Sequence, residues 1–303
     1  MAMMSFGNRR SDTSPVPAAR AAVGMSDTSQ STLETLIVAR PAWGVPDIID
    51  LWRNRELIGI LTWRDISVRY KQALLGLTWA VIQPVVTMVV FSVIFGGVAK
   101  VPSDGVAYPL FSIAALVPWQ LFANSIQRGS MSLVGNSSLL TKVYFPRLAM
   151  PLSSVLSSLV DFVVAAGVMA VVMLFYRVHV GVGVILIIPF TLLALMVSLA
   201  MAIWLSAINV LYRDVQHAVP FLLQVLLYLS PVAYSSRSVP SGWLRVLYSM
   251  NPMDGVIQGF RWALLGVPAN PSAVATSVVL SALGLVSGLI YFRRVERVFA
   301  DVV

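Results

Sequence analysis

Cysteine is absent from this 303-residue chain, and histidine occurs only twice, at His179 and His217. The lack of cysteine excludes a disulfide framework, a thiolate zinc site and a cysteine nucleophile. The two histidines lie far apart in sequence, which argues against a histidine metal cluster. Charged residues are also scarce, at 11%, against about 25% in an ordinary soluble domain. Because 58% of the residues are hydrophobic, too few polar side chains remain to cover a soluble surface, and we predict an integral membrane protein.

The motifs that carry catalysis or nucleotide binding are missing as well. The dipeptide Gly-Lys never occurs, so the chain has no G-x-x-x-x-G-K-[ST] phosphate loop. No H-E-x-x-H sequence is present, and no pair of carboxylates lies within an apolar run. We therefore expect the chain to have no catalytic residue, to bind no metal and to hold no cofactor of its own.

Long apolar stretches dominate what remains. A helix rises about 1.5 Å per residue and the hydrocarbon core is about 30 Å thick, so a spanning helix needs about 20 residues. The candidate spans lie at roughly 76–98, 109–127, 149–176, 184–208, 219–234 and 271–292. We predict an all-α membrane protein with six transmembrane helices.

The region between the fourth and the last span is irregular. The fifth stretch, 219–234, is short and contains Pro220, Ser230 and Pro231, which predicts a broken helix or a span completed by its flanks. The following run, 253–266, is only partly apolar and is too short to cross a bilayer. It is typical of interfacial or re-entrant helices, which are tolerated where the backbone is buried in protein or lines a cavity.

The distribution of basic residues predicts the orientation, because cytoplasmic loops carry an excess of Lys and Arg. With six spans and a cytoplasmic N-terminus, 16 of the 21 basic residues lie inside; the five outside are Lys100, Arg177, Arg237, Arg245 and Arg261. We therefore expect a multi-pass protein with both termini in the cytoplasm. The same placement accounts for the net charge of +8 without nucleic acid.

The segments before the first span are polar or amphipathic. Residues 1–32 are rich in Ser, Ala, Pro and Arg and lack an apolar run, which predicts a disordered cytoplasmic tail and no signal peptide. Met25 offers a second plausible start. In 47–72, Ile48, Leu51 and Trp52 recur at i, i+3 and i+4 beside charged residues, which predicts helices lying in the cytoplasmic membrane interface.

Asp161 is the only acidic residue within a predicted span. Ionisable groups in such positions are costly and usually face the bundle interior or water. Asp161 is therefore either a proton relay or substrate contact, or a helix–helix hydrogen-bonding residue close in sequence to Ser157 and Ser158. We favour the second interpretation, because a relay would need another acid within the spans.

The cytoplasmic segment 135–147 predicts a short amphipathic helix. Asn136 is placed to cap it, Lys142 lies off its apolar face, and Pro146 ends it. Its apolar stripe comprises Leu139, Leu140, Val143 and Tyr144. Such a helix either floats among the lipid headgroups or docks a soluble partner, and the sequence alone favours neither.

Two Arg–Asp pairs are adjacent in sequence, Arg64–Asp65 and Arg213–Asp214. Adjacent residues on a helix do not face each other. We therefore expect neither pair to form a simple mutual salt bridge, so that each charge finds another partner or remains solvated.

Aromatic residues gather near the ends of the predicted spans. They are Trp79, Trp119, Phe122, Trp204, Tyr228, Tyr234, Trp243 and Tyr248. Most of them fit the aromatic belts at the two membrane interfaces. A minority are candidates for lining a substrate path, because sugar rings have apolar faces that pack on aromatic rings.

A series of short motifs in a fixed order extends over about residues 33–303. The motifs are Arg64-Asp65-Ile66, Arg69-Tyr70-Lys71, Leu75-Gly76, Trp79, Pro84, Pro118-Trp119, Lys142-Val143-Tyr144-Phe145-Pro146-Arg147, Tyr212-Arg213-Asp214-Val215, Ser230-Pro231-Val232, Asn251-Pro252-Met253, Gly259-Phe260-Arg261, and Phe292 with Glu296, Phe299, Ala300 and Asp301. This series resembles the ABC-2 type permeases that export polysaccharides. Ala115 departs from it, where family members often carry glycine. The tail 1–32 has no counterpart in the resemblance.

The resemblance implies a transmembrane subunit of an ABC exporter in the bacterial cytoplasmic (inner) membrane. Two copies of the chain would pair with two separate nucleotide-binding subunits, which would use the ATP and magnesium. The expected cargo is a polysaccharide linked to polyprenyl pyrophosphate, with O-antigen ahead of teichoic acid, capsule or cell-wall galactan. The irregular region after 219 would form the outward gate.

The resemblance also assigns residues. The expected ATPase-coupling residues are Arg64, Asp65, Leu140, Lys142, Tyr144, Phe145, Arg213 and Asp214. The expected substrate-path residues are Arg69, Lys71, Trp79, Trp119, Phe122, Tyr228 and Tyr234. Arg64, Arg69, Lys71 and Arg147 are the basic residues that could meet the pyrophosphate, or equally the partner subunit or lipid.

Two other classes of protein remain open. A secondary transporter or flippase would work without an ATPase but would need coupling groups within its spans, and only Asp161 is present. A membrane-embedded glycosyl or acyl transferase would need paired acids or a histidine base, which the sequence lacks.

Overall fold

The computed structural model describes residues 48–71, 76–142, 145–178, 181–238, 242, 245 and 248–296, and every regular element in these ranges is a helix. The predicted tail 1–32, with Met25, lies outside the described residues. The elements are α1 (Ile48–Arg53), α2 (Arg55–Lys71), α3 (Gly76–Phe91), the π-helix η1 (Ser92–Val98), α4 (Tyr108–Met131), η2 (Val134–Asn136), α5 (Ser137–Lys142), α6 (Ala149–Phe175), η3 (Val182–Leu186), α7 (Ile187–Leu211), α8 (Val215–Leu229), η4 (Ser236–Ser238), α10 (Pro252–Leu265) and α11 (Pro271–Glu296).

Five helical segments in the described ranges are long and apolar enough to cross a membrane. They are Thr78–Val98, Tyr108–Met131, Ala149–Phe175, Val182–Leu211 and Pro271–Glu296. These segments match five of the predicted spans and confirm an all-α membrane protein. The remaining stretch forms α8, which has 15 residues and is shorter than the others. Six crossings and a re-entrant α10 therefore stay predictions.

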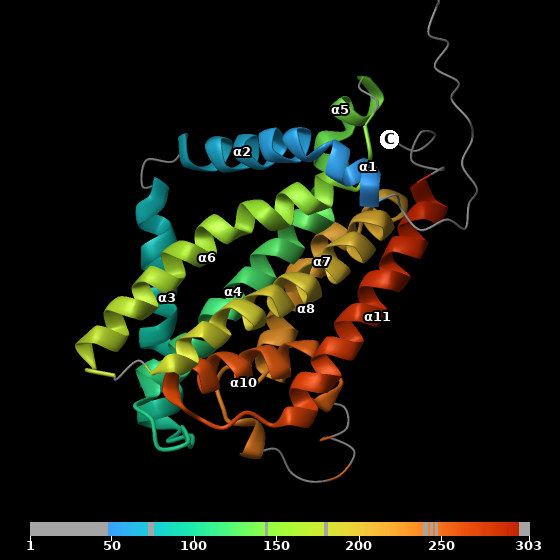
Figure 1. Cartoon of the computed structure of the whole chain (residues 1–303). Coiled ribbons are helices and arrows are strands. Elements are labelled where there is room, and N and C mark those ends of the chain that lie inside the picture. The colour runs from blue at the N-terminus through green and yellow to red at the C-terminus, as the bar shows by residue number, and fades with distance from the viewer. Residues whose placement is uncertain are drawn as a thin grey trace, which may run out of the picture. The chain divides into compact units, whose positions relative to one another are not determined.

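Helix α4 is the centre of the bundle, with α6 and α7 beside it and α3, α8 and α10 also in contact (Figure 1). Its most apolar window is 78% buried, against 11–28% for the other four spans. Small residues such as Ser112, Ala114 and Ala115 are fully or almost fully buried along it. In lipid, helices associate through close packing of such residues rather than through a hydrophobic drive between them.

Glycines mark the closest approaches between helices. A Cβ at Gly129 of α4 would lie 2.5 Å from the Cβ of Ala202 of α7, and one at Gly288 of α11 would lie 2.8 Å from the Trp204 ring. Trp204 in turn donates to the Gly284 carbonyl at 3.2 Å and stacks on Tyr291. These contacts hold α11 on α7 and α7 on α4.

The chain breaks where α8 ends. Ser230 adopts an extended conformation, as expected for the residue before Pro231. The chain becomes helical again at α10, where Asn251 caps the helix by accepting from the Met253 amide at 2.9 Å and Pro252 occupies the first turn. Gly266 ends α10 in the left-handed conformation with φ 69°. The helix therefore ends after Leu229, within the stretch 219–234, and whether this stretch crosses the membrane as a broken helix or with its flanks stays a prediction.

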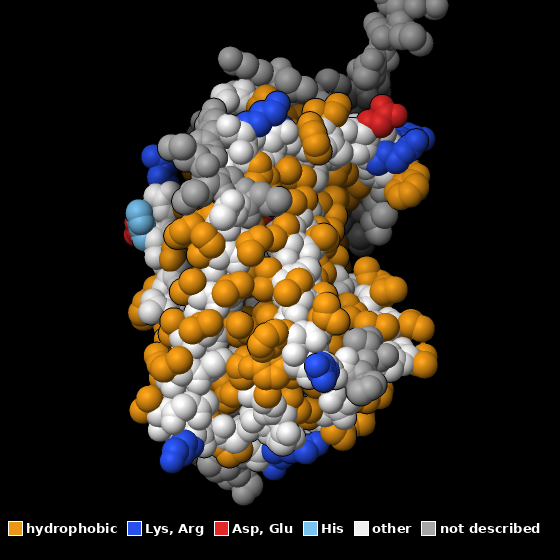
Figure 2. All heavy atoms as spheres, turned by 90° about the vertical axis from the view of Figure 1, so that its left-hand side faces the viewer, with side chains coloured by type: hydrophobic (Ala, Val, Ile, Leu, Met, Phe, Trp, Pro, Cys, Tyr) orange, Lys and Arg blue, Asp and Glu red, His pale blue; other side chains and the backbone are white. Residues whose placement is uncertain are grey.

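The lateral surface of the bundle is largely apolar. Figure 2 shows hydrophobic side chains covering much of one face. Exposed apolar residues on α3, η1 and α6 include Val86, Val93, Ile94, Val163 and Val171. Exposure of so many large apolar side chains indicates contact with lipid or with another membrane-embedded surface.

Candidate functional site

Helix α2 lies along one end of the bundle and packs against α6 (Figure 1). Ile58 and Leu61 of α2 belong to a second hydrophobic cluster, separate from the core around α4, that also contains Leu133, Ile203 and Phe292. Glu56 lies in the first turn of α2, and Arg69 and Lys71 lie in the last turn. These charges complement the helix dipole. The opposite face of α2 exposes Ile60, Trp63 and Val68, as expected of a helix at a membrane or partner interface.

The polar side of α2 meets the bundle at a charge cluster that we define as Arg69, Tyr70, Arg128 and Asp161. Asp161 Oδ2 lies 2.8 Å from Arg69 Nη1 and 2.6 Å from Arg128 Nη2. Its other oxygen accepts a hydrogen bond from the Tyr70 hydroxyl. Three helices, α2, α4 and α6, thus converge on one carboxylate.

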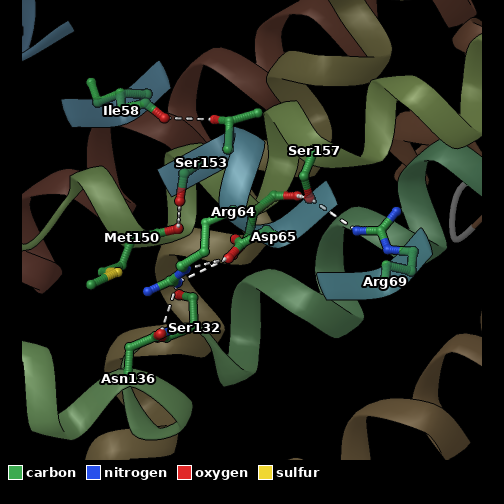
Figure 3. Close-up of polar contacts among 11 residues, drawn as sticks. Ile58, Arg64, Asp65, Arg69, Ser132, Asn136, Met150, Ser153 and Ser157 are labelled. Carbon is green, nitrogen blue, oxygen red and sulfur yellow. Dashed lines mark hydrogen bonds and ion pairs between the residues drawn. The ribbon is translucent and has the colours of Figure 1, made fainter. Parts of the chain in front are cut away.

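Two serines complete the charge cluster. Ser157 Oγ accepts from Arg69 Nη2 at 3.2 Å, as Figure 3 shows, and Ser158 Oγ accepts from Arg128 Nη1 at 3.2 Å. Both serines are fully buried, whereas the side chains of Arg69, Arg128 and Asp161 keep 24%, 29% and 15% exposure. Two guanidinium groups face one carboxylate, so the cluster carries one excess positive charge.

This arrangement bears on the two interpretations of Asp161. The expected helix–helix hydrogen bonding is confirmed, but the partners are arginines and a tyrosine from other helices rather than the nearby serines. Those serines bind the arginines instead. Burial, together with the hydrogen bond to Asp161, raises the pKa of the Tyr70 hydroxyl, which keeps it protonated and available as a donor.

Arg64 and Asp65 do form an ion pair, contrary to the expectation from their adjacency. Arg64 Nη2 lies 2.9 Å from Asp65 Oδ1, and the same nitrogen donates to Asn136 Oδ1 at 2.8 Å (Figure 3). The expectation was wrong because the rule on neighbouring positions concerns Cβ directions, whereas the long arginine side chain curls back over its neighbour. The pair thereby presents Arg64 to Asn136.

Asn136 links α2 to the segment predicted to dock a partner. It lies in η2, and its Nδ2 donates to the Ser132 carbonyl at 2.8 Å, so its side chain joins α2 and α4 rather than capping α5. Beyond α5, Phe145 packs with Leu139 against the second hydrophobic cluster. Leu140 and Lys142 belong to α5, but their side chains, like all of Tyr144, lie outside the described residues.

Arg213 and Asp214 form the exposed turn between α7 and α8. The end of α7 is tied to the end of α4 by a hydrogen bond of 2.8 Å from Asn209 Nδ2 to the Ser130 carbonyl. Because Ser130 is only two residues after Arg128, this turn lies at the same end of the bundle as Arg128. No ion pair joins Arg213 to Asp214 among the described residues, as expected.

The other basic candidates differ in how far they are engaged. Arg69 is held by the charge cluster, and Arg147 donates to the Glu296 carbonyl at the end of α11. Lys71 is exposed, with neither a hydrogen bond nor an ion pair in the described part of the chain. Of these residues, Lys71 has the charge most accessible to an incoming anion.

The aromatic path candidates divide into two groups. Trp119 and Phe122 are 5% and 3% exposed and contact each other inside the core around α4. Trp79 and Tyr228 are 58% and 54% exposed on α3 and α8. Tyr234 is half-buried and donates to the Tyr228 carbonyl at 2.9 Å. Only the exposed pair lies on the surface of the single chain, and their role in a path stays a prediction.

Sequence reasoning missed the role of two arginines that had been counted only as loop charges. Arg128 belongs to the charge cluster, and Arg261 of α10 is 3% exposed. Arg261 donates to the carbonyls of Phe111, Tyr234 and Val232 at 3.3, 3.3 and 3.0 Å, and its guanidinium lies 3.4 Å from the centre of the Phe111 ring. The sequence signal for Arg261 was its position within the largely apolar run 253–266 and within the motif Gly259-Phe260-Arg261.

Known proteins are similar to this chain in sequence. The family described as ABC-2 type transporter matches residues 56–265. The chain is 26% identical to the "O-antigen export system permease protein RfbA" of Klebsiella pneumoniae, over 82% of this chain and 95% of that protein. It is 30% identical to the protein of the same name from Myxococcus xanthus, over 70% and 81%. It is 23% identical to the "Polysialic acid transport protein KpsM" of Escherichia coli, over 72% and 86%. These matches and the apolar helices show that the chain is a multi-pass membrane protein of the ABC-2 type transporter family.

Proposed function

We propose that this chain is the transmembrane subunit of a bacterial ABC exporter that moves a polyprenyl-pyrophosphate-linked polysaccharide across the cytoplasmic membrane. O-antigen is the first choice of cargo, because the relatives of highest similarity given above carry that name. The working unit would be two copies of this chain with two separate ATP-binding subunits, which hydrolyse ATP with magnesium. Both termini would lie in the cytoplasm.

The observation that carries this proposal is the bond between α2 and η2. Arg64 and Asn136 are 72 positions apart, yet they join the two elements expected to receive the ATPase. Phe145 anchors the chain after α5 to the same hydrophobic cluster that holds α2. A force applied to either element would therefore reach the other, as a docking face for a motor subunit requires.

The charge cluster supports a route from that face to the spans. Arg69 and Tyr70 of α2 hold Asp161 of α6, which also holds Arg128 of α4. Displacement of α2 by a closing ATPase would pull on the central helix and on α6 together. Part of the cluster remains exposed, so its ion pairs can shift without leaving a charge in an apolar core.

The basic residues of α2 support a role in receiving the pyrophosphate. Lys71 is exposed at the end of α2, and the cluster beside it carries an excess positive charge. A compact ammonium group of this kind is a common phosphate ligand. Trp79 and Tyr228 would then meet sugar rings on the surface that the second copy of the chain completes.

A secondary transporter or flippase without an ATPase has less support. Both oxygens of Asp161 are engaged by Arg69, Arg128 and Tyr70, which favours a structural role over that of a mobile proton carrier. The described spans offer no other acidic residue in their apolar windows for coupling.

The proposal is tested by co-expressing the chain with the product of an adjacent gene that contains a phosphate loop. We expect co-purification of the two proteins and ATP-dependent export of a lipid-linked glycan from inverted vesicles. Replacing the phosphate-loop lysine of the partner should abolish export without separating the proteins. Export that persists without any nucleotide-binding subunit would overturn the ABC assignment.

The docking face is tested with Phe145→Asp, which places a charge where α5 joins the second hydrophobic cluster. We expect this variant to lose both the ATPase and export while the permease still inserts in the membrane. The matched control is Phe175→Asp, at the exposed opposite end of α6. If Phe145→Asp keeps the ATPase and full export, this segment does not contact the motor.

A further inference from the structure

A cavity of about 510 Å³ with several polar and charged side chains in its wall lies at the end of the bundle opposite the charge cluster. It is lined by η4, α10, the start of α11 and the segment that precedes α11. The other end of α11 packs with α2 through Phe292, and a helix of 26 residues is roughly 39 Å long. Figure 1 shows α10 and the start of α11 at the end of the bundle away from α2. In the predicted orientation the cavity therefore lies on the outer side. Its volume falls within the range of about 300–1,000 Å³ that is usual for small-ligand sites.

The wall of the cavity is a connected hydrogen-bond network. Asp254 Oδ1 accepts from Ser236 Oγ at 2.7 Å and from Gln258 Nε2 at 2.8 Å. Gln258 Oε1 accepts from the Asn270 amide at 2.9 Å. The network fixes the orientation of each polar group before any ligand arrives, which reduces the cost of binding.

The same network leaves hydrogen-bonding capacity unused. The second carboxylate oxygen of Asp254 has no hydrogen bond among the described residues, although the residue is only 5% exposed. The second oxygen of Asp254 can therefore accept a hydrogen bond from a ligand in the cavity. The ring of Tyr248, another lining residue, packs beside Tyr234 with the ring centroids 6.0 Å apart.

The charges of the cavity favour an anion with hydroxyl groups. Arg237 and Arg245 are exposed on its wall, and Asp254 is the one acidic residue among the described lining residues. Burial raises the pKa of the Asp254 carboxyl. A guanidinium group binds a carboxylate through two parallel bonds, and carboxylate and amide oxygens accept from hydroxyl donors.

We propose that this cavity binds one or two sugar units of a glycan on the outer side and prefers acidic sugars, with Arg237 and Arg245 on the sugar carboxylate. This inference rests on the proposed function, because it takes the ligand class from polysaccharide export. The ring hydroxyls hydrogen-bond to Asp254, Gln258 and Asn270. The ring of Tyr248 offers an apolar surface to a sugar face.

The test uses the full chain in phosphatidylcholine nanodiscs without any ATPase. The probes are the disaccharide of galacturonic acid and the uncharged galactose disaccharide of the same linkage, and saturation-transfer NMR measures their dissociation constants. We expect the acidic disaccharide to bind more tightly to the wild-type chain. The double variant Arg237→Gln, Arg245→Gln should lose about tenfold in affinity for it, since two charge-assisted bonds disappear, while the neutral disaccharide changes little.

Two further variants make the result specific. Ser272→Trp, at an exposed lining position, should abolish binding of both disaccharides by filling the cavity. Arg177→Gln removes an exposed arginine outside the cavity and should change nothing. Equal binding of the acidic disaccharide to wild type and the double variant would overturn the proposal. So would tighter binding of glycerol phosphate than of either sugar, which would identify a lipid-headgroup site.

Failure here is distinguishable from failure of the proposed function. If the wild-type complex exports glycan but the double variant binds the acidic disaccharide normally, the cavity assignment is wrong and the exporter stands. If no ATP-dependent export occurs in the wild type, the exporter assignment fails whatever the binding data show.

Discussion

The two ends of this bundle use arginine in opposite ways. In the charge cluster, Arg69 and Arg128 are partly exposed and share one carboxylate, Asp161. At the other end, Arg261 is almost fully buried and binds three backbone carbonyls and an aromatic ring. Partly solvated ion pairs exchange partners at low cost, whereas a buried charge that loses its partners is strongly destabilising. The first arrangement allows the helices to move relative to one another, and the second holds its region in one conformation.

The contacts of Arg261 meet a physical need of the backbone after α8. After α8 the backbone leaves the helix, so Val232 and Tyr234 have carbonyls without helical partners, and unsatisfied backbone groups are costly at membrane depth. The Arg261 side chain reaches both carbonyls from α10 and also holds the start of α4 through Phe111. One side chain thereby fixes the irregular region that surrounds the cavity.

The largest expected effect comes from Arg261→Gln. Three carbonyls lose a charged donor, each contributing about 1.5–3 kcal/mol, so we expect a large drop in thermal stability and little folded protein. Fluorescence-detected size-exclusion after heating measures it. The exposed Arg237→Gln is the matched control and should be stable. A normal melting temperature for Arg261→Gln would show that the region is held by other contacts.

Asp161→Asn should have the next largest effect, on function more than on folding. It leaves two guanidinium groups facing each other without a counter-charge, and we expect export to fall about tenfold or more while the ATPase still binds. The double variant Asp161→Asn, Arg128→Gln removes the repulsion and should recover part of the stability. Non-additivity in this double-mutant cycle measures the coupling; strictly additive effects would contradict the cluster.

Asn136→Ala breaks the link between α2 and η2 and should act more weakly. It removes the hydrogen bonds to Arg64 and to the Ser132 carbonyl, each contributing about 1 kcal/mol to stability. We expect the coupling of ATP hydrolysis to export to fall while ATPase binding persists, as measured by the ratio of glycan exported to ATP hydrolysed. Asn54→Ala, in the turn between α1 and α2, serves as the control. An unchanged ratio would separate α2 from the docking face.

Tyr70→Phe should have the smallest effect, and a distinctive pH dependence. The raised pKa of Tyr70 means that the unfolded chain loses this proton first, near pH 10, so its contribution to stability is complete below that pH and is lost above it. We expect the melting temperature of the wild type to fall more steeply above about pH 10 than that of Tyr70→Phe. Tyr234 and Tyr248 remain in both proteins, so parallel curves would contradict the assignment.

Local sequence patterns predicted the elements well and the site only in part. The spans, the break near Ser230 and Pro231, and the stop at Gly266 follow from apolar length, proline restriction and glycine geometry, which depend on neighbouring residues. The Arg64–Asp65 pair was mispredicted because side-chain reach was ignored. Arg128 and Arg261 were missed because their roles depend on partners 27 to 150 positions away.

By itself, the sequence determined that the chain is an α-helical membrane protein, since composition and apolar length leave no other way to satisfy its backbone in lipid. Only the tertiary structure decided which charges meet. The sequence indicated that Asp161 needs a partner. The serines on its own helix are close to it in sequence, whereas its actual partners come from other helices and are distant in sequence. Partner choice depends on how α2, α4 and α6 cross, because charges interact through space within a few ångströms and no local pattern records that distance.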